Sequence, residues 1–79
     1  MSDRLITRIG RALYGDQWKG PTARELEVQK GTVDDWDRGR MEPLAKHYVR
    51  LLAIAEARLA LLQRVVAELR AHVSGSPRA

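Results

Sequence analysis

The side chains that could support catalysis or bind a metal ion are few in this chain, and they stand far apart. His47 and His72 are twenty-five positions apart on one predicted helix, and neither lies near a plausible nucleophile. Glu68 and His72, four residues apart, are typical of an exposed helix pair. The aspartates at 34–37 are not embedded in a phosphate-binding or metal-binding loop pattern. With no cysteine in the chain either, the sequence predicts no enzyme, no metal site and no cofactor.

A stretch from Trp18 to Trp36 organises the first half of the chain. Ala23 and Leu26 share one face of a predicted helix, and Val33 and Trp36 share one face of a second. The few residues around Val28 leave room only for a tight corner between the two. We therefore expect two short helices that pack against each other, with Trp18 as a lid over their core.

This spacing resembles the helix-turn-helix domain of phage Cro and lambda-type repressors and their small bacterial relatives. Such relatives often read LYG, W, LAR, LGV, TVRRW and G. The corresponding pieces here are Leu13-Tyr14-Gly15, Trp18, Thr22-Ala23-Arg24, Leu26-Glu27-Val28, Thr32-Val33-Asp34-Asp35-Trp36 and Gly39. The resemblance covers about the first half of the chain and implies a DNA-binding domain.

The chain departs from this pattern in two places. Glu27 stands where the family usually has glycine, and a side chain at positive φ carries a cost that glycine avoids. Asp34, Asp35 and Asp37 stand where relatives commonly carry arginine, and carboxylates repel a phosphate backbone. Acidic groups near a helix N-terminus also have a structural interpretation, because they stabilise its positive end.

Local signals predict the limits of the helices in this half. A first helix over 3–15 would have Ser2 as its cap and Gly15 as its stop, and a third would run from Lys30 to Arg38 with Gly39 as its stop. The second would open at 20–22, where Pro21 suits the first turn. The inward face of the first helix is expected to carry Leu5, Ile9, Ala12 and Leu13. Two capping boxes are predicted, Thr22 with Glu25 and Thr32 with Asp35.

If the third helix enters a major groove, its outward side chains become candidates for DNA contact. Gln29 could pair with adenine, Lys30 and Arg38 could meet guanine or phosphate, and Asp34 could accept from cytosine. Lys19, beside a helix N-terminus, could touch a phosphate. The full set of candidate DNA-binding residues is Lys19, Gln29, Lys30, Thr32, Asp34, Asp35, Arg38 and Arg40.

A long last helix is predicted from 44 to 73, because this range has neither proline nor glycine and Pro43 precedes it. Apolar residues recur at alternating intervals of four and three, as in a coiled coil. The candidate oligomerisation residues are Leu52, Ala55, Leu59, Leu62, Val66 and Leu69. A second apolar flank of Leu51, Ile54, Leu61 and Val65 broadens the stripe. We therefore expect a homodimer or higher oligomer, with folding of this helix back onto the head as the alternative.

Composition limits the remaining possibilities. Seventy-nine residues with 44% apolar and 5% aromatic side chains predict one small all-α unit: a helix-turn-helix head over 1–42, the long helix over 43–73 and a disordered tail over 74–79. The net charge is +4, but residues 21–43 hold four basic and six acidic side chains. No signal peptide or membrane span is evident, so we expect a soluble, cytoplasmic protein.

Two functions remain open. The first is a sequence-specific DNA-binding transcriptional regulator that acts as a homo-oligomer on double-stranded DNA. The alternative is a phage-like assembly protein, similar to small terminase subunits, in which the head is a scaffold and the acidic third helix binds protein. The acidic third helix is the feature that discriminates between them.

Overall fold

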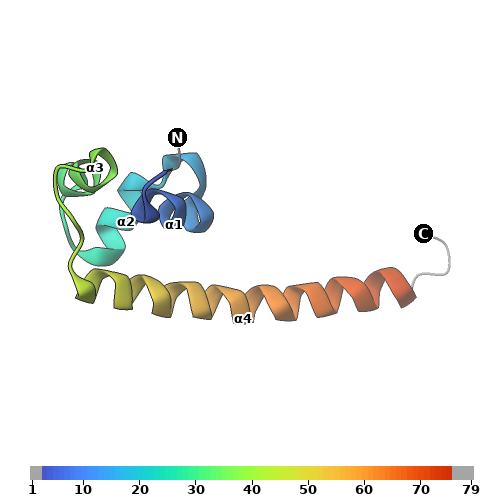
Figure 1. Ribbon diagram of the computed structural model, residues 1–79. Coiled ribbons are helices and arrows are strands. Elements are labelled where there is room, and N and C mark those ends of the chain that lie inside the picture. The colour runs from blue at the N-terminus through green and yellow to red at the C-terminus, as the bar shows by residue number, and fades with distance from the viewer. Residues whose placement is uncertain (1–2, 76–79) are drawn as a thin grey trace.

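The computed structural model describes residues 3–75, and within that range the protein is helical and contains no strand (Figure 1). The elements in chain order are α1 (Leu5–Tyr14), the short 3-10 helix η1 (Gly15–Gln17), α2 (Lys19–Leu26), α3 (Lys30–Arg38) and α4 (Ala45–Gly75). We call α1, η1, α2 and α3 together the head. The head packs on the first part of α4, and the rest of α4 projects beyond it (Figure 1). The predicted all-α class and the long last helix are confirmed.

Trp18 packs against α1 at a point where α1 carries no side chain. A Cβ atom on Gly10 would lie 2.0 Å from Cε3 and 2.6 Å from Cδ2 of the Trp18 indole, so this approach requires glycine. The indole is 2% exposed, which confirms the prediction that Trp18 covers the core of the head.

The buried face of α1 differs from the predicted one. The sequence pattern places Leu5, Ile9, Ala12 and Leu13 on the inward face. Leu5 is 51% exposed and Ala12 is exposed, so these two assignments are wrong, whereas the other two are partly buried against the core. The fully buried positions are Ile6, Thr7 and Gly10. An apolar pattern treats glycine as neutral, but Gly10 faces the core because it receives the Trp18 indole.

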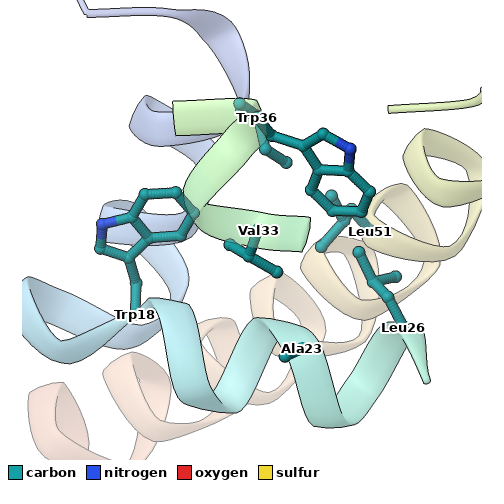
Figure 2. Close-up of a cluster of buried hydrophobic side chains, with 7 residues drawn as sticks. Trp18, Ala23, Leu26, Val33, Trp36 and Leu51 are labelled. Carbon is teal, nitrogen blue, oxygen red and sulfur yellow. The ribbon is translucent and has the colours of Figure 1, made fainter. Parts of the chain in front are cut away.

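A three-residue connection joins α2 to α3. Glu27 ends α2 in the left-handed region, with φ 56° and ψ 44°, and the Val28 N–H donates to the Ala23 carbonyl at 3.0 Å. Glu27 itself therefore adopts the positive φ, and the turn forms without glycine. Figure 2 shows Val33 and Trp36 of α3 with Leu26 and Leu51 in one buried cluster.

Neither predicted capping box forms. α2 begins at Lys19, so Thr22 is its fourth residue, and its buried Oγ1 has no hydrogen-bond partner within residues 3–75. α3 begins at Lys30, so Thr32 is its third residue, and no side chain caps the helix. The predicted cap Ser2 lies outside the described residues.

The predicted helix stops are confirmed. Gly15 and Gly39 both have φ 79° and follow the last residues of α1 and α3. The range Lys30–Arg38 matches the predicted third helix, and Pro21 lies in the first turn of α2.

α4 is 31 residues long and receives the head near its N-terminus. Leu51 is its one fully buried residue within the described range, and every residue from 56 to 75 is exposed. The helix continues to Gly75, two residues beyond the predicted end; residues 76–79 of the predicted tail lie outside the description. No helix within 3–75 has both the length and the apolar character that a bilayer crossing requires.

Candidate functional site

The N-terminal end of α3 is exposed to solvent. Gln29 precedes the helix with an extended backbone, and its side chain makes no capping hydrogen bond. Gln29, Lys30 and Gly31 are exposed, and Thr32 is half-buried. Three predicted contact residues thus lie together within one turn at the N-terminal end of α3, and the side chains of Gln29 and Lys30 are exposed.

Lys19, Asp34 and Asp37 form an ion-pair network that connects α2 with α3. Lys19 Nζ lies 2.6 Å from Asp34 Oδ1 and 3.1 Å from Asp37 Oδ2. From α1, the Thr7 hydroxyl donates to Asp37 Oδ1 at 2.5 Å. The network therefore ties all three helices of the head together. Its lysine is partly withdrawn from solvent, with a side chain that is 27% exposed.

These contacts shift the pKa of each charged member toward the ionised form. The hydrogen bond to Asp34 raises the pKa of Lys19, and the hydrogen bond from Lys19 lowers the pKa of Asp34. The hydrogen bond from Thr7, reinforced by Lys19, lowers the pKa of Asp37. All three groups are charged at neutral pH, so Lys19 offsets one of the two carboxylate charges in this network.

Two further cations reach the carboxylates of α3. Arg38 Nε lies 2.9 Å from Asp34 Oδ2, one helical turn away, and Arg40 Nη1 lies 3.4 Å from Asp35 Oδ1. Asp34 is therefore held between two cations. The negative charges that distinguish this helix from a basic recognition helix are each matched by a positive side chain at its surface.

The aspartates do not lie in the first turn of α3. The interpretation that they stabilise the positive helix end is therefore wrong, because that effect fades beyond the first turn. Their partners are the side chains of Lys19, Arg38 and Arg40. Thr7 and Asp37 were not among the candidate site residues, and nothing in their spacing could have identified them because their partners lie on other helices.

Lys30 remains available for an external partner. It is exposed and forms no ion pair within residues 3–75, and the same holds for Arg8 and Arg24. Lys30 and Lys19 line one shallow hollow with Asp16, Gln17 and Gly20, at the place where α2 and α3 both begin. The structure thus brings two of the predicted DNA-binding lysines to the same depression.

The predicted oligomerisation residues lie along α4 on a face that the head leaves open. Leu52, Leu59, Leu62 and Leu69 are each 57–58% exposed, and Val66 is 41% exposed. Ala55 is half-buried. The second predicted flank is buried at one end and exposed at the other. Leu51 packs in the core of the head and Ile54 is half-buried. Leu61 and Val65 are exposed.

His47 lies in the first turn of α4 and hydrogen-bonds the residue that precedes the helix. Its Nδ1 accepts a hydrogen bond of 3.0 Å from the Leu44 N–H, and its ring centroid lies 4.9 Å from that of Trp36. Burial, with a smaller contribution from Lys46, lowers the pKa of His47 below 6.5. Within residues 3–75 no three His, Asp or Glu side chains are grouped so that they could hold a metal ion.

No protein-family model, curated protein or solved structure matches this chain.

Proposed function

We propose that the protein is a helix-turn-helix DNA-binding regulator that acts as a homo-oligomer, with α3 presented to the major groove of double-stranded DNA. The observation that carries the proposal is the α2–α3 pair. Two short helices are joined by three residues around a left-handed Glu27, and the N-terminal turn of the second is exposed with Gln29 and Lys30. In helix-turn-helix proteins the N-terminal residues of the second helix contact base edges.

The compensated aspartates support this function as well. An uncompensated carboxylate beside a phosphate would weaken binding, but Asp34 is held by Lys19 and Arg38, and Asp35 by Arg40. Each ion pair cancels the carboxylate charge at distances longer than the pair itself, so the net repulsion of a phosphate backbone is smaller than the sequence predicts. The unpaired Lys30 then supplies the net attraction of the helix end, with Gln29 as the side chain able to read adenine.

Binding of the purified chain to duplex DNA from upstream of its own gene tests the proposal. We expect the affinity to fall linearly with salt on logarithmic axes. Lys30→Ala should weaken binding and reduce the salt slope by about one. Arg64→Ala is the matched control, because it removes one exposed cation of α4 that forms no ion pair within residues 3–75 and lies far from α3. Absence of binding at low salt, or equal losses in the two variants, would contradict the proposal.

A second candidate is an assembly protein in which α3 contacts another protein. The half-buried Asp35 favours it, because within residues 3–75 its single cation partner is Arg40, and this 3.4 Å contact is the longest ion pair of the α3 aspartates. Asp35→Arg is the discriminating variant, since it leaves the Lys19 network intact. DNA affinity that appears only in this variant favours assembly, whereas altered sequence preference with higher overall affinity favours DNA recognition.

A further inference from the structure

We infer that two copies of the chain pair through α4 in antiparallel orientation, in a register centred on position 64, so that both heads lie on the same side of the helix pair. It specifies how the chains of the proposed homo-oligomer pair, and its functional meaning rests on the proposed function. It is based on two observations: the head covers part of one side of the apolar stripe on α4, and the other side carries charged residues.

The seam follows a heptad spacing along the exposed part of α4. The core positions are Leu52, Ala55, Leu59, Leu62, Val66, Leu69 and Val73. In a two-stranded coiled coil each seam is bordered by two edges, which decide the orientation of the partner. We call the edge with Leu51, Arg58 and Val65 the head edge, and the edge with Glu56, Gln63 and Arg70 the free edge.

The head occupies the first part of the head edge. Leu51 is 2% exposed in the core of the head. Arg58 donates to the Leu13 carbonyl, and its guanidinium lies 4.8 Å from the centroid of the Tyr14 ring. A second helix can therefore approach the seam from the side of the free edge, where the side chains are exposed.

The free edge carries charges that complement themselves only in antiparallel orientation. In such a pair, equivalent edges of the two helices adjoin. With the register centred on position 64, Glu56 of each copy lies beside Arg70 of the other, and the two Gln63 side chains meet near the centre. Neither Glu56 nor Arg70 has an ion-pair partner within residues 3–75.

The same register pairs the seam residues from Ala55 to Val73. Ala55 faces Val73, Leu59 faces Leu69, and Leu62 faces Val66, with each pair repeated by the two-fold axis. Alanine opposes valine at the ends, leucine opposes leucine in the next layers, and leucine opposes valine at the centre. The contact lies beyond most of the head and buries the side chains that a single copy leaves exposed.

A parallel pair neither brings opposite charges together along the seam nor places both heads on the same side. There the head edge of one helix adjoins the free edge of the other, which sets Arg58 beside Gln63 and Val65 beside Arg70. No opposite charges meet. The two heads would also sit at the same end and, because the two-fold axis then runs along the helices, on opposite sides of the pair.

The antiparallel pair gives the heads a useful spacing. Its two-fold axis is perpendicular to the helices, so both head edges point to one side. Leu51 lies thirteen positions from the centre in each copy, which separates the two Leu51 anchors by about 39 Å along the axis, and the two His47 residues by about 51 Å. The Leu51 separation is close to one turn of B-form DNA, about 34–36 Å, after which the major groove returns to the same face of the duplex. Two heads could therefore contact one face of the same duplex.

Charge reversal tests the orientation without DNA. Glu56→Arg alone and Arg70→Glu alone each place like charges together twice per dimer, so we expect the dimer dissociation constant to rise about tenfold in sedimentation equilibrium. An equimolar mixture of the two variants should recover the wild-type affinity, because every pair then combines opposite charges. Glu68→Arg, a reversal away from the seam, is the control and should leave self-association unchanged.

Spin labels provide a second measurement. With Ala53→Cys as the only cysteine, the antiparallel register separates the two labels by about 33 Å along the axis, whereas a parallel pair sets them side by side. A short Ala53 distance, mixed variants that do not recover, or a chain that stays monomeric would each overturn the inference. DNA binding is measured separately, so an antiparallel dimer without DNA affinity would refute the proposed function and leave the pairing intact.

Discussion

Replacing Gly10 with alanine tests whether the contact between α1 and Trp18 organises the head. In an exposed helix interior this change stabilises the helix by about 1 kcal/mol, because alanine is the better helix former. At Gly10, however, the new Cβ would lie 2.0 Å from Cε3 and 2.8 Å from Cζ3 of the Trp18 indole. These distances are far below van der Waals contact, and both neighbours are rigid ring atoms of a buried side chain.

The two effects can be compared in size. Overpacking a core by one methyl group costs about 1–3 kcal/mol, and so severe an overlap belongs at the upper end of that range. After the gain in helix propensity is subtracted, we expect Gly10→Ala to lower the free energy of unfolding by about 2 kcal/mol. For a domain of this size the melting temperature should fall by about 8–16 °C.

Urea unfolding followed by tryptophan fluorescence, at fixed protein concentration, measures this effect. Gly31→Ala is the matched control because its added Cβ would meet no atom within 4 Å, so it should be neutral or stabilising. Combining Gly10→Ala with Trp18→Leu should cost less than the sum of the single changes, since the ring that causes the overlap is gone. If Gly10→Ala is as stable as Gly31→Ala, the close packing of Trp18 on α1 is refuted.

Three further predictions concern the turn and the titrating groups. Glu27→Gly should raise the free energy of unfolding by up to about 1 kcal/mol in thermal melts, because glycine adopts φ 56° without strain; an unchanged or lower stability would contradict this. The pKa of His47 is lower in the folded state, so the free energy of unfolding should fall as the pH drops from about 7 toward 5. The variant His47→Gln can still accept a hydrogen bond from the Leu44 N–H but does not titrate. It should therefore flatten that decline when urea unfolding is measured as a function of pH. The pKa values of Asp34 and Asp37 are lowered in the folded state, so their contribution to the free energy of unfolding is present above about pH 4 and lost below it. The stability difference between wild type and Lys19→Met should therefore shrink in acid. A difference that stays constant with pH would refute the ion-pair network.

Local signals in the sequence determine much of the fold. Residues that constrain only the backbone near them set four features: the ends of α1 at Gly15 and of α3 at Gly39, the range of α3, and the length of α4. Glycine permits a positive φ wherever the chain must leave a helix, and a long range without proline or glycine continues as one helix. The apolar seam of α4 is visible for the same reason, because heptad spacing is a property of one helix.

Only the tertiary structure decides which groups meet across helices. The sequence contains Thr7, Lys19, Asp34 and Asp37, but nothing in their spacing assigns them to one network. It also shows Gly10 without showing that the indole of Trp18, the residue before α2, packs directly against it. Such contacts depend on the angles and rotations with which helices pack, and these are set by all the side chains of the core together rather than by any local pattern.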